Sequence, residues 1–127
     1  MSPRPDDSAP ATIRARGLAC GYHGDPVLTD IGLDVRCGEV LCLLGPNGVG
    51  KTTLAKTICG LHRQVSGSVE IDGVALRAER RRALCYMVMQ DPDYQLFSDS
   101  VLGELSLGGR RDADVCERAL RRLGLWD

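Results

Sequence analysis

The chain has 127 residues, of which 43% are hydrophobic and 26% are charged, and this composition is typical of one globular domain rather than a disordered or fibrous protein. Its 16 basic and 17 acidic residues give a net charge of −1, which removes the electrostatic reason to expect a nucleic-acid partner. The longest apolar run, Val40–Leu44, is far shorter than the roughly 20 residues that cross a bilayer. A membrane-spanning protein is therefore not expected.

The first eleven residues form a polar, proline-containing segment without an apolar core. This pattern predicts a disordered leader over residues 1–11 and no secretory signal. No C-x-x-C pair occurs among the six cysteines, which are Cys20, Cys37, Cys42, Cys59, Cys85 and Cys116. A zinc site and disulfides are the alternatives, but these spacings favour reduced, packed thiols in a cytosolic protein.

Three strands are expected in the first third of the chain. Residues 12–18 and 28–35 alternate between apolar and polar side chains, as half-buried strands do. The buried set of the second strand should be Leu28, Ile31, Leu33 and Val35. Val40–Leu44 is apolar on both faces, which predicts a central strand of a covered parallel sheet.

The middle of the chain predicts a loop, a helix, a hairpin and a strand. Residues 45–50 are rich in glycine, and residues 51–61 place apolar side chains at helical spacing with Gly60 near the end. Asp72-Gly73 is a strong two-residue hairpin signal between two short strands within residues 68–76. Residues 84–89, LCYMVM, read as another short apolar strand.

Two helices are expected towards the C-terminal end of the sequence. Residues 100–107 form the first, and Asp112 or Asp114 caps the second, which runs to Leu123. Its apolar face should comprise Val115, Ala119, Leu120 and Leu123. Clustered arginines are interpreted as solvated surface, namely Arg80–Arg82, Arg110–Arg111 and Arg121–Arg122.

The glycine-rich loop carries the most specific motif in the chain. Residues 45–52, Gly45-Pro46-Asn47-Gly48-Val49-Gly50-Lys51-Thr52, match G-x-x-x-x-G-K-[ST] in full, and chance gives such a match in a chain of this composition with a probability of about 0.3%. Glycines let backbone amides approach phosphates, and the helix N-terminus adds its positive end. Lys51 would contact the β- and γ-phosphates, and Thr52 would offer its hydroxyl to Mg²⁺. Thr53 is included in the predicted phosphate-binding set.

Residues 12–127 resemble the ATP-binding cassette (ABC) ATPase family. Three stretches carry this resemblance: GYHGDPVLTDIGLDVRCGEVLCLLGPNGVGKTTLAKTICGL, SGSVEIDG and MQDP. The resemblance implies ATP and Mg²⁺ as cofactors. It also implies that Tyr22 stacks on adenine, which suits an aromatic face because stacking needs no hydrogen bonds. Gln90 matches the family's glutamine loop, whose side-chain oxygen reaches Mg²⁺ and the attacking water, so Lys51 and Gln90 are the expected catalytic residues.

The continuation QDPDYQLF resembles the ATPases of energy-coupling-factor importers, which take up vitamins or metal ions. This resemblance implies a second ABC ATPase domain and a transmembrane coupling subunit as partners. Tyr94, Leu96 and Phe97 would then belong to the apolar surface that docks the coupling helix. A peripheral position on the cytoplasmic face of the cell membrane follows from the same resemblance.

Three motifs of the family do not occur in these residues: the LSGGQ signature, the strand ending in Asp-Glu, and the switch histidine. Residues 105–109, LSLGG, are interpreted as a helix end and a turn. The expected fold is α/β, a P-loop NTPase core in which a parallel sheet lies beside antiparallel strands from residues 12–35 and 67–76. The sequence is expected to be truncated, so that it comprises the N-terminal part of a cassette. The complete cassette should be an ATPase, whereas this chain alone should hydrolyse ATP slowly. A non-hydrolysing nucleotide-binding fragment and a soluble cassette protein without a membrane partner are the alternatives.

Overall fold

The structure is a computed structural model that describes residues 11–107 and 112–126. Its contacts divide the chain into two units, Met1–Met87 and Val88–Asp127. Among the described residues, no helix is both long enough and apolar enough to span a membrane. The predicted leader lies outside the described residues except for Ala11, which is the first residue of a strand and so is not part of a leader.

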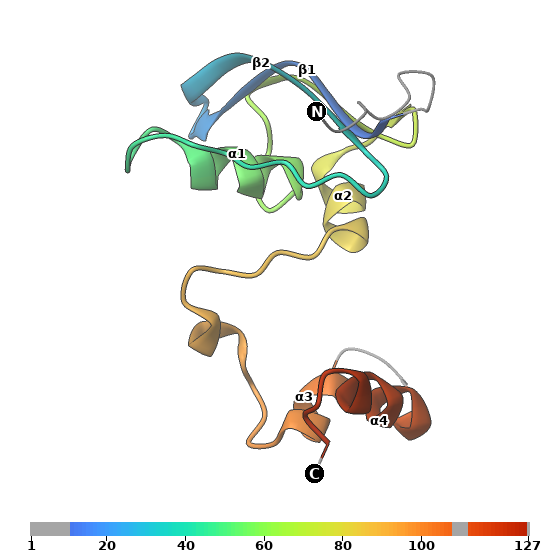
Figure 1. Cartoon of the computed structure of the whole chain (residues 1–127). Helices are drawn as coiled ribbons and strands as arrows, with labels where there is room; N and C mark the ends of the chain where they lie inside the picture. The colour runs from blue at the N-terminus through green and yellow to red at the C-terminus, as the bar shows by residue number, and fades with distance from the viewer. Residues whose placement is uncertain (1–10, 108–111, 127) are drawn as a thin grey trace, which may run out of the picture. The chain divides into compact units, whose positions relative to one another are not determined.

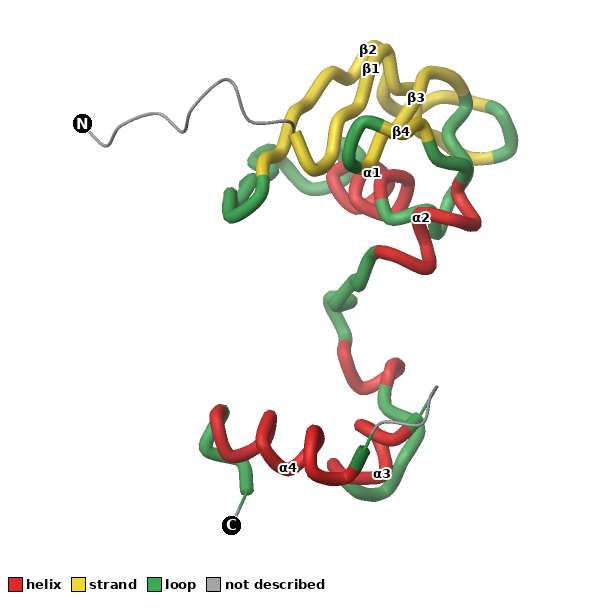
Figure 2. Tube along the Cα trace, turned by 90° about the vertical axis from the view of Figure 1, so that its right-hand side faces the viewer, coloured by secondary structure: helices red, strands yellow, loops and turns green. Residues whose placement is uncertain are grey.

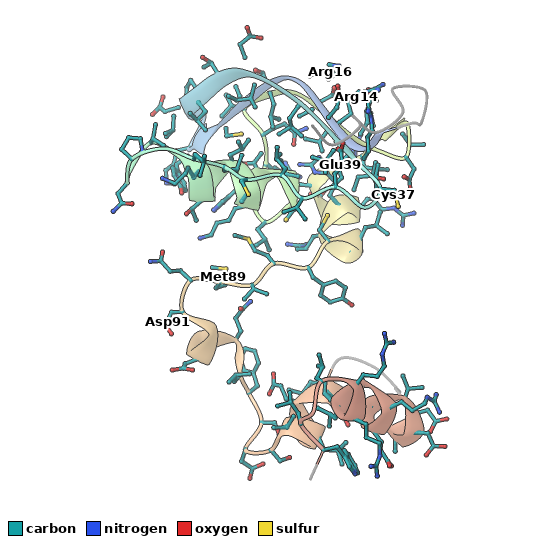
Figure 3. All side chains as sticks on the ribbon, in the orientation of Figure 1. Arg14, Arg16, Cys37, Glu39, Met89 and Asp91 are labelled. Carbon is teal, nitrogen blue, oxygen red and sulfur yellow. The ribbon has the colours of Figure 1, made fainter. Side chains whose placement is uncertain are left out.

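An antiparallel sheet of four strands dominates the first unit, in the order β2-β1-β3-β4 (Figures 1 and 2). The strands are β1 (Ala11–Tyr22), β2 (Asp25–Arg36), β3 (Ser66–Ile71) and β4 (Val74–Ala75). The antiparallel strands expected from residues 12–35 and 67–76 are therefore confirmed. Figure 3 shows Cys37 and Glu39 near the end of β2, where the Glu39 carboxylate accepts a hydrogen bond of 2.7 Å from the Arg36 amide.

The β3–β4 hairpin turns at the predicted Asp72-Gly73 pair. Both residues have positive φ, 49° for Asp72 and 78° for Gly73. Two successive left-handed residues match the twist of the flanking strands, and aspartate followed by glycine tolerates that conformation well. The local sequence is thus sufficient to specify this turn.

The core of the first unit lies between the sheet and a helix, α1 (Lys51–Ile58), which Figure 1 shows beneath the strands. Its buried members are Ala15, Leu18, Cys20, Leu54 and Val69. The four expected apolar residues of β2 are all half-buried, and three of them, Leu28, Ile31 and Leu33, pack against this core. The alternating pattern of β2 therefore predicted the correct face.

A second helix, α2 (Ala78–Leu84), packs against the end of α1. Gly60 ends the α1 region with a φ of 81°. A Cβ atom at Gly60 would lie 2.1 Å from the Ala78 carbonyl oxygen. Only glycine permits both this backbone conformation and this approach of the two helices.

Two predicted strands do not form. Residues 40–44 have no regular secondary structure and no strand partner among the described residues, and Val40 and Leu44 remain 90% and 91% exposed. Residue Leu84 belongs to α2, and residues 85–90 follow as an irregular segment. A strand that is apolar on both faces needs a neighbour to accept its backbone hydrogen bonds. The described residues supply no such neighbour, so the parallel part of the expected sheet is not assembled.

The second unit contains a 3-10 helix, η1 (Pro92–Gln95), and two α-helices, α3 (Val101–Ser106) and α4 (Ala113–Arg122). Ser100 caps α3 and Asp112 caps α4 through their side-chain oxygens, as expected for these residue types. The predicted apolar face of α4 is only partly correct. Cys116 and Leu120 are buried, whereas Val115, Ala119 and Leu123 are exposed.

Candidate nucleotide-binding site

The glycine-rich loop 45–50 leads directly into α1. Gly50 is the residue before the helix and has a φ of 102°. It carries no side chain that could cap the first-turn amides, and no side-chain cap is formed. The first N–H groups of a helix have no acceptor within the helix, so this loop presents uncapped donors where the positive end of the α1 dipole lies.

Lys51 turns its side chain back over the loop. Its Nζ atom donates to the Gly45 carbonyl oxygen at 2.6 Å and to the Pro46 carbonyl oxygen at 2.7 Å. The ammonium group therefore sits at the start of the loop rather than along the helix. Positive charge and uncapped amides together make the loop a site that favours an anion.

The first turn of α1 also positions two threonines with different surroundings. Thr52 is exposed, whereas Thr53 is buried and its Oγ1 lies 3.1 Å from the hydroxyl of Tyr22. This bond links the end of β1 to the start of α1. The exposed Thr52 hydroxyl is the one available to a metal ion or phosphate.

Tyr22 combines a fixed hydroxyl with a partly open ring. The side chain is 46% exposed, and its ring makes an edge-to-face contact with His62, with centroids 5.3 Å apart. A hollow lies beside it, lined by Gly21–Gly24 and His62–Val65. A ring held at its hydroxyl and at one edge keeps a stable orientation, which is what a stacking platform requires.

A second hollow adjoins the glycine-rich loop. It is mainly apolar and is lined by Leu28, Ile31, Cys42, Leu43, Leu44, Val49, Lys51 and Leu54. The exposed Val40–Leu44 segment contributes one wall. The loop thus adjoins a mainly apolar surface.

Gln90 and the predicted docking residues belong to the second unit, Val88–Asp127, whereas the glycine-rich loop belongs to the first. Gln90 is exposed, as are Leu96 and Phe97, the latter at 82%. Tyr94 lies in η1. The amides of Phe97 and Ser98 both donate to the Glu104 carboxylate, at 2.9 and 2.7 Å. This carboxylate fixes the backbone that carries the exposed apolar side chains.

Sequence reasoning missed the role of Arg81. The arginine run 80–82 is expected to be solvated surface, but Arg81 is 0% exposed. Its guanidinium donates to the carbonyl oxygens of Ile58, Thr57 and Leu76 and to the Gln64 side chain. Burial lowers the pKa of Arg81 from its ordinary value. The composition of residues 78–84, AERRRAL, is a sequence signal for a helix, because alanine, glutamate, arginine and leucine all favour helices.

The cysteines also differ from expectation in part. Cys20 and Cys116 are buried, as packed thiols should be, but Cys37 and Cys42 are exposed. Among the described residues, no group of three or more histidine, cysteine or acidic side chains is arranged to hold a metal ion. Oxygen donors such as the Thr52 hydroxyl are the ligand type that Mg²⁺ prefers.

Comparison with known proteins shows which family the chain resembles. The family described as "ABC transporter" matches residues 28–127. An ABC transporter ATP-binding protein of Treponema denticola is 50% identical over 97 residues, which cover 76% of this chain and 20% of that protein. A second, from Streptomyces coelicolor, is 37% identical over 134 residues, which cover 98% of this chain and 47% of that protein. The chain spans less than half of the length of these two relatives.

A solved structure has the same fold. CbiO1 from Clostridium perfringens, described as part of the ABC transporter complex cbiONQ, aligns with a TM-score of 0.77 and 30% identity over 93% of this chain and 53% of that one. The antiparallel strands and α1 therefore belong to an ABC ATPase fold, a P-loop NTPase architecture. From the match over residues 28–127 and the structural alignment, the chain belongs to the ABC transporter ATP-binding family, whose members are ATP-hydrolysing P-loop NTPases.

Proposed function

We propose that residues 45–53 bind the triphosphate of ATP and that this chain forms part of the ATP-binding subunit of an energy-coupling-factor importer. One observation carries the nucleotide part of the proposal. The Lys51 ammonium lies over a loop whose following helix has uncapped N-terminal amides. This is the arrangement that a phosphate chain needs, because it supplies both charge and directed donors.

The roles of individual residues follow from their positions. Gly45–Gly50 would place backbone amides around the phosphates, and Lys51 would release its two carbonyl contacts to pair with the β- and γ-phosphates. Tyr22 would stack on adenine, since its side chain is 46% exposed and its hydroxyl is held by Thr53. The length of the nucleotide would then run from the end of β1 to the start of α1.

The exposed Thr52 hydroxyl and the exposed Gln90 amide fit Mg²⁺ as neutral oxygen ligands. When bound, Mg²⁺ supplies charge neutralisation on the phosphate oxygens. Thr52 would hold the ion next to the loop, and Gln90 is proposed as a second ligand from its match to the family's glutamine loop. Lys51 provides the remaining positive charge.

The wider role of the protein is proposed from the QDPDYQLF segment and from the similarity to CbiO1. We infer a transmembrane coupling subunit that contacts Tyr94, Leu96 and Phe97, and a second ATPase domain that completes the nucleotide site. The substrate would be a vitamin or a metal ion, and the protein would work at the cytoplasmic face of the membrane. The exposed apolar side chains of Leu96 and Phe97 support a docking role.

A thermal melt of the 127-residue chain with and without Mg²⁺–ATP tests nucleotide binding. ATP at about 100 times its Kd adds roughly 2.7 kcal/mol to the free energy of unfolding, which corresponds to several degrees in Tm for a domain of this size. Lys51→Ala should abolish this shift, because it removes the charge that pairs with the phosphates.

The chain offers a matched control, because its other lysine, Lys56, lies in the same helix. Lys56→Ala should keep the ATP-dependent shift. Equal loss in both variants, or an unchanged shift in Lys51→Ala, would contradict the assignment of the loop as the nucleotide site.

A further inference from the structure

His62 lies beside Tyr22 and is not part of the site predicted from the sequence. The two rings meet edge to face, with centroids 5.3 Å apart and an interplanar angle of 77°. This separation and angle are those that aromatic pairs prefer. Both residues also line the hollow next to the end of β1. The imidazole is thus in direct contact with the ring that would stack on adenine.

The backbone that carries His62 is tied to both the helix and the sheet of the first unit. At the end of α1, the amides of Leu61 and His62 both donate to the Lys56 carbonyl oxygen, at 2.9 and 3.2 Å. Further along the same connection, the Val65 amide donates to the Ala19 carbonyl oxygen of β1 at 2.8 Å. The imidazole therefore extends from a segment that is hydrogen-bonded at each end.

Tyr22 is held from both ends of α1. Its hydroxyl lies 3.1 Å from the Thr53 hydroxyl in the first turn, and its ring contacts His62 beyond the last turn. Its backbone is paired with Asp25 in the β1–β2 register. The side chain nevertheless remains 46% exposed, so these contacts leave surface of the ring available to a ligand.

The hydroxyl contact alone does not fix the plane of the Tyr22 ring. In any tyrosine, the Cβ, Cγ, Cζ and hydroxyl oxygen atoms lie on one line, which is the axis of the broad χ2 rotation. Turning the ring about this axis leaves the oxygen in place, so the bond to Thr53 is compatible with every orientation of the ring plane. A contact beside the ring removes this freedom, and the His62 ring supplies such a contact. Stacking depends on the plane, because a base has to lie against the face of the ring.

We propose that His62 is a positioning residue for recognition of the nucleotide base, because it fixes the plane of the Tyr22 ring before adenine stacks on it. This inference rests on the stacking role proposed for Tyr22. Without the imidazole, the ring has to be ordered when the nucleotide binds, and the loss of side-chain freedom weakens the affinity. The glycine-rich loop and Lys51 keep their own contacts, so the effect is confined to ligands that carry a base.

Isothermal titration calorimetry of the 127-residue chain with two probes tests the proposal. ATP with Mg²⁺ engages both the loop and Tyr22, whereas inorganic tripolyphosphate with Mg²⁺ supplies a phosphate chain without a base. We expect His62→Ala to raise the Kd for ATP by about 2- to 10-fold and to leave the Kd for tripolyphosphate unchanged. His62→Phe, which keeps an aromatic ring at this position, should restore the native affinity for ATP. Leu61→Ala, at the exposed neighbouring position, is the matched control and should leave both Kd values unchanged.

A double variant separates positioning from direct contact with the base. Tyr22→Ala should weaken ATP binding by about tenfold or more, because the stacking contact itself is lost. In that background His62→Ala should have no further effect, since the ring that it positions is gone. An equal effect of His62→Ala with and without the Tyr22 ring, or an equal loss of affinity for ATP and tripolyphosphate, would overturn the proposal.

The Tyr22→Ala variant also distinguishes this inference from the proposed function on which it rests. An unchanged Kd for ATP in Tyr22→Ala would contradict the stacking of adenine and, with it, the role of His62. Weakened binding in Tyr22→Ala together with native affinity in His62→Ala would contradict the role of His62 alone.

Discussion

At the scale of single residues, Arg81 is the clearest case of a charged side chain that stabilises the fold. Its guanidinium is fully buried and donates to three backbone carbonyl oxygens and to the Gln64 side chain. Two of these carbonyls belong to the last turn of α1, where regular intrahelical donors run out, although the Thr57 carbonyl also accepts from the Gly60 amide at 3.1 Å. Arg81 therefore acts as a C-terminal cap for the helix that begins at Lys51.

We predict that Arg81→Met lowers the free energy of unfolding by about 3 kcal/mol, because several buried acceptors lose their donor at once. Urea unfolding followed by circular dichroism measures the change. Arg80→Met, at the exposed neighbouring position, removes the same charge and should alter stability by less than about 0.5 kcal/mol. Similar losses of unfolding free energy in both variants would show that the positive charge, rather than the buried hydrogen bonds of Arg81, stabilises the fold.

Some residues discussed above can be recognised from the neighbouring sequence alone, whereas others depend on contacts that form only in the folded chain. The glycine-rich loop 45–50 and the helix that follows it could be predicted because both are contiguous in sequence, whereas Tyr22 was chosen only from the family resemblance. Arg81 could not, since its partners at Thr57, Ile58 and Leu76 are defined only after the chain folds. A run of three arginines looks the same whether its middle member is exposed or buried.

At the scale of elements, turns and caps were predictable and unpaired strands were not. Asp72-Gly73 specifies its own hairpin, and Asp112, one of the two caps expected for the last helix, caps α4. Residues 40–44 have strand-like composition, but a strand also needs a neighbour. The composition of a segment shows which secondary structure it favours, whereas strand pairing depends on residues elsewhere in the sequence.

The β1–β2 pair illustrates how charge adds to strand pairing. Arg14 lies opposite Asp34 in the register, its Nε atom 2.7 Å from the carboxylate, and Arg16 approaches the same carboxylate at 3.0 Å. Figure 3 labels these two arginines on the sheet. Their hydrogen bonds and charge lower the pKa of Asp34. A carboxylate with a lowered folded-state pKa stabilises the fold above its unfolded pKa of about 3.9, and this contribution is lost as the pH falls through the folded value.

We predict that Asp34→Asn lowers Tm at pH 7 and that the difference from the native chain shrinks below about pH 4, where the native carboxylate becomes protonated. The effect should be small and should weaken in high salt, since all three side chains are partly exposed. Calorimetric melts across this pH range measure it, with Asp25→Asn at the other end of β2 as the control. A difference that stays constant with pH would exclude the ion pair as its cause.

At the scale of the whole molecule, the described residues leave a large amount of apolar surface exposed. Val40 and Leu44 are almost fully open, and Leu41 and Leu43 of the same segment are also exposed. They adjoin the mainly apolar hollow beside the glycine-rich loop. An exposed apolar segment whose backbone pairs with no strand is a template for contact with another chain.

We therefore predict that the isolated 127-residue chain self-associates, and that Val40→Lys with Leu44→Lys shifts it towards the monomer. Charged side chains on an exposed edge oppose pairing between copies, because pairing would bring like charges together and desolvate them. Sedimentation velocity over a range of protein concentrations measures the shift. Leu123→Lys, at a comparably exposed apolar position in the second unit, adds the same type of charge and should leave association unchanged. A native chain that stays monomeric at every concentration, or an equal response to Leu123→Lys, would show that residues 40–44 are not the surface that drives association.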